Sequence, residues 1–178
     1  MVTRRVDVKN GGDFLMRKTH KLTLTAMMVA IGTLTSNLFF IPIGVTKVFP
    51  IQHFLNVLSA VVLGPFYAVA QALCVSILRN IMGTGSIFAF PGSMVGALLA
   101  GLLFMKTKKI YMAFTGEVIG TGIIGAILCY PIATLLLGQK AALFGFIPLF
   151  IFSSIAGALI GAIILTLFLK KQVASLYS

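Results

Sequence analysis

Five long stretches of this sequence contain no charged side chain, and they constrain the fold more than any other feature. They are Leu22–Thr46, Val48–Leu78, Asn80–Met105, Val118–Gln139 and Ala141–Leu169. Each is long enough to cross a bilayer as a helix, which takes about 20 residues. The alternating pattern of an outer-membrane strand is absent, so we predict an all-α membrane protein.

The basic residues lie at the ends of these stretches. The formal net charge of +11 would by itself suggest a nucleic-acid partner. The charges instead cluster before Leu22, in the loop at 106–109, and at Lys170–Lys171. Clusters of this kind are typical of cytoplasmic loops. We therefore expect a multi-pass protein of the cell membrane and no nucleic-acid partner.

The number of spans depends on how Val48–Leu78 is divided. As one helix it gives five spans and places the basic clusters on opposite sides of the membrane. Gly64-Pro65 is a natural break, because proline is favoured at the first position of a helix. Splitting there gives six spans, with both termini cytoplasmic. The predicted helices are Leu22–Ile41, Phe49–Leu63, Pro65–Ile81, Pro91–Met105, Ile110–Leu137 and Ala142–Leu169.

The predicted organisation has three parts. A basic N-terminal segment covers residues 1–21, the six-helix domain covers 22–169, and a cytoplasmic tail covers 170–178. Met16 is the expected native start, because the codons of Gly11-Gly12-Asp13 can form a ribosome-binding sequence a few bases upstream.

Several polar side chains are predicted to share one depth near the outer face. At 1.5 Å per residue, Asn37 and Arg79 lie about 21–22 Å from the inner boundary of a core about 30 Å thick. His53 and Asn56 lie about 6–10 Å below the outer boundary, and Ser93 lies just above them. A charge at membrane depth is costly and by default marks function. The layer predicts a small-molecule pocket open to the outside.

Each member of this layer also has a structural interpretation. Arg79 can extend its charge to the outer interface, because it lies near a helix end. A single buried histidine such as His53 is more often a satisfied core residue. Asn37 and Asn56 can hold helices together. Only the coincidence of depth favours the pocket.

Aromatic residues near the same face are candidates for closing the pocket. The glycine-containing loop at 83–90 is predicted to fold over it. Phe88 and Phe90 can stack on a planar ligand, although for each of them alone ordinary packing is the favoured explanation. Tyr130, near the outer end of the fifth span, is the other candidate.

Glu117 is the only acid in the predicted spans. Its predicted depth is about 12 Å from the inner boundary, which is about 9 Å below Arg79 and closer to Gln71. Three interpretations remain open. Glu117 is a protonated structural acid, a partner of Arg79 through a bridging group, or a proton site.

Small residues recur at a spacing of four. Ala26 and Ala30 lie in the first span, and the pairs Gly92–Gly96, Gly116–Gly120 and Gly157–Gly161 follow. Such pairs let membrane helices approach closely. We expect the glycine pairs to pack inside the bundle.

Enzyme motifs are missing from the sequence. It contains no phosphate-binding GxxxxGK[ST], no HExxH and no pair of intramembrane carboxylates. Cys74 and Cys129 have no metal-ligand spacing and are predicted to be structural thiols. We therefore predict a non-enzymatic protein that binds no metal or other cofactor.

The order of the motifs resembles the ThiW family of energy-coupling-factor (ECF) transporter S components. A basic start and an AxxxA first helix precede FPIQHFLNVLSAVVLGPFYA and LRNIMGTGSIFAFPGSMVGALLAGLL. The resemblance covers nearly all of the chain from Met16 onward. The stretches Pro50–Ala68 and Leu78–Leu103 carry most of its specificity.

The resemblance implies a substrate-binding subunit of the bacterial cytoplasmic membrane. Such subunits dock on a transmembrane coupling protein with two cytoplasmic ATPases, which use ATP. Ala26 and Ala30 correspond to the docking surface. The implied substrate is the thiazole precursor of thiamine, hydroxyethylthiazole. The predicted substrate-binding residues are Asn37, His53, Asn56, Arg79, Phe90, Ser93, Glu117 and Tyr130.

Other functions remain open at this point. One is a stand-alone proton-coupled carrier that uses Glu117, and another is an S component for thiamine or a different vitamin-like ligand. A purely structural subunit would bind no ligand at all.

Overall fold

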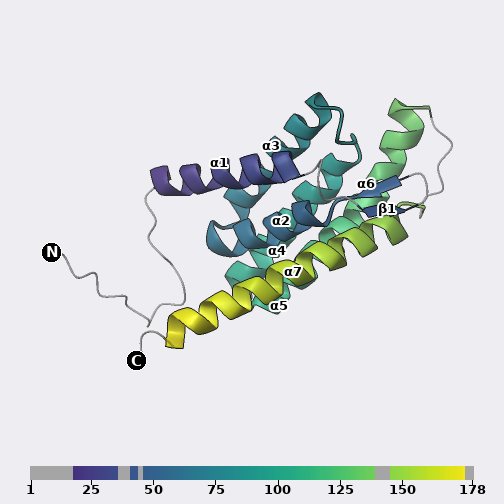
Figure 1. Ribbon diagram of the computed structural model, residues 1–178. Helices are drawn as coiled ribbons and strands as arrows, with labels where there is room; N and C mark the ends of the chain where they lie inside the picture. The colour runs from purple at the N-terminus through teal and green to yellow at the C-terminus, as the bar shows by residue number, and fades with distance from the viewer. Residues whose placement is uncertain (1–17, 36–40, 44–45, 139–144, 175–178) are drawn as a thin grey trace.

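The computed structural model describes residues 18–35, 41–43, 46–138 and 145–174 (Figure 1). Over these ranges the chain is mainly helical, as predicted. A short antiparallel hairpin is the exception, formed by β1 (Ile41–Ile43) and β2 (Thr46–Val48), with Ile41 opposite Val48. The first predicted helix was therefore extended too far, because Ile41 lies in a strand.

Helices follow one another closely along the rest of the described chain. They are α1 (Lys18–Thr35), α2 (Pro50–Val62), α3 (Pro65–Ile81), α4 (Ala89–Thr107), α5 (Ile110–Ile119), η1 (Gly120–Gly125), α6 (Ala126–Pro131), η2 (Ile132–Leu136) and α7 (Ile147–Ala174). The segments from α5 to η2 form one helix of 27 residues, in which η1 and η2 are π-helical.

Three described helices are long and apolar enough to cross a membrane. They are Ala89–Thr107, Ile110–Leu136 and Ile147–Phe168. Two further apolar helices, α2 and α3, are shorter. Most predicted boundaries lie within two residues of the observed ones. The last helix begins at Ile147 and continues past Lys170–Lys171 to Ala174, whereas Ala142 lies outside the described residues.

Backbone geometry explains two of the helix breaks. Gly64 has a φ of 93° and Pro65 begins α3, so the predicted Gly-Pro break is confirmed. Glycine adopts positive φ without steric cost. Lys108 closes α4 in the left-handed region, with a φ of 58°. The α4–α5 connection is therefore a sharp turn that brings the two helices side by side.

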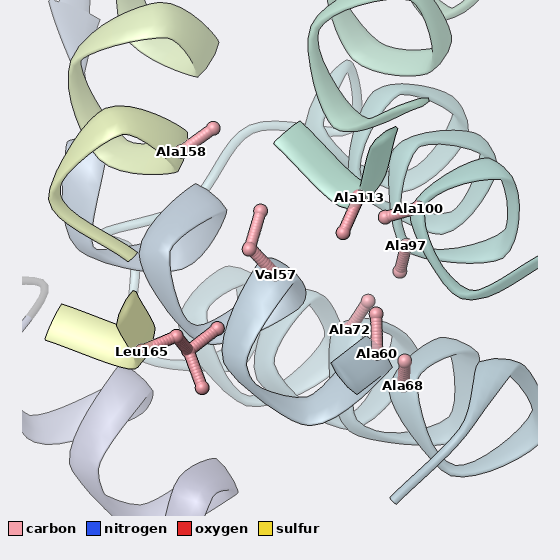
Figure 2. Packing of buried hydrophobic residues seen from close by; sticks show 9 residues of the cluster. All are labelled: Val57, Ala60, Ala68, Ala72, Ala97, Ala100, Ala113, Ala158 and Leu165. Carbon is pink, nitrogen blue, oxygen red and sulfur yellow. The ribbon is translucent and has the colours of Figure 1, made fainter. Parts of the chain in front are cut away.

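Alanine dominates the main core cluster (Figure 2). The cluster consists of Val57, Ala60, Ala68, Ala72, Ala97, Ala100, Ala113, Ala158 and Leu165. Side chains this small let the backbones of α2, α3, α4, α5 and α7 come close together. Close approach matters in a membrane, because lipid supplies no hydrophobic drive for helix association.

Glycines form a close contact between α4 and the long helix that begins with α5. A Cβ at Gly120 would lie 2.7 Å from the Cα of Gly96, and one at Gly125 would overlap the Cα of Gly92. The contact points on the long helix are thus spaced by five residues across η1. A π-helical turn takes up one extra residue, which explains this spacing.

The pair Gly157–Gly161 packs α7 against α2. A Cβ at Gly157 would overlap the carbonyl oxygen of Pro50, and one at Gly161 would lie 3.3 Å from that of Phe54. All three glycine pairs therefore pack inside the bundle, as expected. The alanine pair of α1 does not pack inside the bundle. Helix α1 packs on α3 and α2 through other residues, and Ala26 and Ala30 are exposed.

Candidate functional site

A cavity of about 430 Å³ lies where α2, α3, α4, η1 and α7 meet the loop after α3. Its volume is in the range of small-molecule pockets. The lining residues are Phe49, Gln52, His53, Arg79, Gly83, Thr84, Gly85, Ser86, Phe88, Ala89, Gly92, Ser93, Thr121, Phe146, Leu149, Phe150 and Ser153. A mostly apolar wall with a few polar groups is typical of ligand sites.

Arg79 is the charged group in this wall. Its side chain is 2% exposed, and its guanidinium group lies 3.8 Å from the centre of the Phe49 ring. Nη1 donates to Oε1 of Gln52, and Nη2 donates to the carbonyl oxygen of Thr84 at 3.1 Å. All of these partners are neutral. Nε has no hydrogen-bond partner within the described chain.

The loop after α3 is fastened to the end of that helix. The backbone N–H groups of Thr84 and Gly85 both donate to the carbonyl oxygen of Arg79, at 2.9 Å. The side chain of Asn80 donates to the carbonyl oxygen of Ser86 at 3.3 Å. Position 85 needs glycine, because a Cβ there would lie 2.8 Å from the Asn80 backbone nitrogen. The loop at 83–86 thus forms one wall of the cavity.

Glu117 lies directly behind the histidine in the wall. Its Oε1 lies 2.8 Å from Nδ1 of His53, and it accepts hydrogen bonds from Asn56 at 2.9 Å and Thr121 at 3.0 Å. Among the described residues, its Oε2 has no hydrogen-bond partner. It packs toward Gly96, where a Cβ would lie 2.7 Å away. The carboxyl group is fully buried and does not line the cavity.

This contact determines what His53 can offer a ligand. An ionised carboxyl group can only accept hydrogen bonds, so Oε1 of Glu117 pairs with the tautomer of His53 that carries Nδ1–H. Nε2 of His53 then carries the lone pair. His53 lines the cavity, so this nitrogen is the natural acceptor for a ligand hydroxyl. The carboxylate fixes both the tautomer and the orientation of the ring.

Two sets of hydrogen bonds, one from Arg79 and one from Glu117, meet at Ser93. Nε2 of Gln52 donates to Oγ of Ser76 at 3.1 Å, and Ser76 lies 3.2 Å from Oγ of Ser93. The hydroxyl of Ser93 donates to the carbonyl oxygen of Ala89. The backbone carbonyl oxygen of Ser93 accepts from Nδ2 of Asn56. Arg79 and Glu117 are therefore linked indirectly, through polar groups that meet at Ser93.

The aromatic wall is formed by Phe88 in the loop after α3, by Phe146 in the turn before α7 and by Phe150 in α7. The rings of Phe88 and Phe146 are 4.9 Å apart, and those of Phe146 and Phe150 are 6.3 Å apart. Aromatic faces of this kind accept a planar ring by stacking.

The predicted site residues divide into three groups. His53, Arg79 and Ser93 line the cavity. Asn56 and Glu117 are buried behind it and bonded to one another. Phe90 and Tyr130 do not line it, whereas Phe88 does, and Asn37 lies outside the described residues.

The predicted level of Glu117 was wrong, because Glu117 contacts His53 directly. The estimate assumed parallel helices that each reach both membrane boundaries. Helix α2 has only 13 residues, or about 20 Å, so levels counted from its ends do not correspond to levels counted along the longer helices.

Several lining residues were missed by the sequence prediction. Gln52 lies four residues before Asn56, and Thr121 lies four residues after Glu117. That spacing puts each pair on one helix face. The sequence therefore contained a signal for Gln52 and Thr121. Phe146, Phe150 and Ser153 carry no such signal, because an aromatic or a serine inside an apolar stretch is usually packing.

The fold and the cavity together define a class: a helical membrane protein with a small-molecule site built between its helices. Comparison with protein families is more specific. Residues 22–171 match ThiW, described as a thiamine-precursor transporter protein, and the chain belongs to this family. The predicted resemblance is confirmed. No curated protein and no solved structure matches the chain.

Proposed function

We propose that this protein is the substrate-binding S component of an ECF importer in the bacterial cytoplasmic membrane. Six spans are assigned to it, with both termini cytoplasmic: α1, α2, α3, α4, the helix from α5 to η2, and α7. The observation that carries the proposal is the cavity with aromatic and polar walls in a protein of a thiamine-precursor transporter family. ATP is used by two partner ATPases and not by this chain.

Hydroxyethylthiazole is the proposed substrate. It is a small, planar, neutral ring with one acceptor nitrogen and one hydroxyl donor. In the cavity, the rings of Phe88 and Phe146 can cover its face, and Nε2 of His53 can accept from its hydroxyl. Arg79 can donate to the ring nitrogen. Each polar atom of this ligand thus has a complementary group.

Calorimetric titration of the detergent-purified chain, without partner subunits, tests this proposal. We expect hydroxyethylthiazole to bind at least about 100-fold more tightly than the pyrimidine precursor of thiamine, because the latter presents a different pattern of donors and acceptors. Binding of the pyrimidine or of thiamine instead would keep the transporter class and change the substrate. Folded protein that binds none of them would reject the proposed function.

The exposed face of α1 is the proposed docking surface for the coupling protein. Ala26 and Ala30 are exposed on it, next to the exposed apolar side chains Met27 and Ile31. Small residues in such a position let a partner helix approach closely.

Ala26→Trp is expected to abolish co-purification with the coupling protein while ligand affinity stays within about threefold of wild type, because the side chain points away from the cavity. Met27→Leu, a change of similar volume on the same face, serves as the control and should retain assembly. Lost binding with intact assembly would contradict the assignment.

A proton-coupled carrier is the second candidate, favoured by the buried contact between His53 and Glu117. It differs in requiring no ATPase. Uptake by proteoliposomes that contain this chain alone, driven by a proton gradient, would replace the S-component proposal.

A further inference from the structure

The wall of the cavity carries a positive charge that no acid within it balances. The sequence contains three acids, Asp7, Asp13 and Glu117. The first two lie outside the described residues. Over the described ranges, the single ion pair within contact distance is the one between His53 and Glu117. Arg79 is held by an amide, a carbonyl and an aromatic ring.

Glu117 is poorly placed to cancel this charge at the ligand. Its Oε1 is occupied by His53, Asn56 and Thr121, and its Oε2 faces the backbone at Gly96. Arg79 lines the cavity, whereas Glu117 does not. Electrostatic interactions weaken with distance and strengthen where water is excluded. A ligand therefore meets the guanidinium group first. Protonation of His53 would add charge of the same sign.

The aromatic wall on its own would have the opposite preference. Aromatic faces attract cations, and cages of such rings bind quaternary ammonium groups. Here one face of Phe49 is already covered by the guanidinium of Arg79. A second cation in the cavity would gain a modest contact with Phe88 or Phe146 and would be repelled by a desolvated like charge, which is the larger effect.

We propose that Arg79 is a specificity-determining residue that admits neutral rings and excludes rings with a fixed positive charge. This inference rests on the proposed function and adds a rule of selection to it. A neutral ring nitrogen brings a lone pair, which Arg79 can bind. A quaternary ring nitrogen has no lone pair and brings a charge. The site thereby distinguishes a free thiazole from the thiazolium ring of thiamine, by building repulsion against the wrong ligand.

Three ligands of nearly equal shape test this rule by calorimetry. The first is hydroxyethylthiazole. The second is its N-methyl thiazolium derivative, which has a fixed charge. The third is a neutral thiophene analogue with a methyl group on the ring carbon that replaces the nitrogen. The last two both lack the acceptor and differ only in charge, so their affinity ratio isolates the repulsion from the lost hydrogen bond.

We expect wild type to bind the thiophene analogue at least about 30-fold more tightly than the thiazolium. In Arg79→Gln this ratio should fall at least about tenfold, and in the matched control Arg79→Lys, which keeps the charge, it should persist. A wild-type ratio below about threefold would overturn the inference without any variant. An undiminished ratio in folded Arg79→Gln would also overturn it.

Failure of this inference can be told apart from failure of the proposed function. Wild type that binds hydroxyethylthiazole and the thiazolium equally well would refute the charge rule alone. Wild type that binds no thiazole at all would refute the function first, and the charge rule with it.

Discussion

Replacing Glu117 with alanine is expected to weaken ligand binding by about 10- to 100-fold and to lower the melting temperature. The substitution removes the acceptor of Nδ1–H of His53 and of an amide N–H of Asn56, whereas Thr121 keeps the carbonyl oxygen of Gly92 as an acceptor. A buried donor without a partner costs about 1–3 kcal/mol. His53 also loses the group that fixes its tautomer. Calorimetric titration with hydroxyethylthiazole and a thermal melt of the same sample measure both effects.

Glu117→Gln is the matched variant, because it keeps an accepting oxygen and removes only the charge. If Glu117 positions His53, the glutamine variant should bind ligand within about fivefold of wild type, since the amide oxygen can still accept from His53 and Asn56. If the negative charge itself matters, glutamine should be as damaging as alanine. That second outcome would contradict the positioning role and favour the proton-site interpretation.

The second large effect is expected at Gly157, on the face of α7 that packs against α2. A Cβ at this position would overlap the carbonyl oxygen of Pro50 and lie 2.8 Å from the Cβ of His53. The obstacle is backbone in the first turn of α2, so relief requires the two helices to separate. Overpacking of this kind typically costs about 1–3 kcal/mol. Gly157→Ala should therefore lower the melting temperature by about 3–10 °C and should also weaken ligand binding.

Gly161→Ala is the control on the same face of the same helix. Its nearest contacts would be 3.3 Å from the added Cβ, which neighbouring atoms can accommodate by small shifts. We expect a change of at most about 2 °C. A thiol-reactive dye can follow the melt through buried Cys129, in a Cys74→Ser background, because Cys74 is exposed. Equal losses in the two alanine variants would refute the packing argument.

Much of the fold was predictable because charges and prolines interrupt an otherwise apolar chain. The break at Gly64-Pro65 and the basic loop after α4 both fall where the sequence placed them. The hairpin was not predicted, since strands of three residues are too short to show an alternating pattern.

The cavity was predictable in part. Polar residues inside apolar stretches identified His53, Arg79 and Ser93, because burial of such groups needs a reason. Helix tilt and the length of α2 decide which groups meet, and neither can be obtained by counting residues. Glu117 was therefore placed too far from His53. Phe90 was predicted as a substrate-binding residue, but Phe88 lines the cavity instead. The two lie two residues apart at the start of α4, and the sequence does not show which of them faces the cavity.

The π-helical segment η1 decides which residues of the long helix face α4. The extra residue in this turn places Gly125, and not position 124, against α4. In a regular α-helix the residue one turn after Gly120 would be Ile124, whose side chain could not fit where even a Cβ would overlap the Cα of Gly92. The register of the long helix, and not its composition alone, therefore sets how closely it approaches α4.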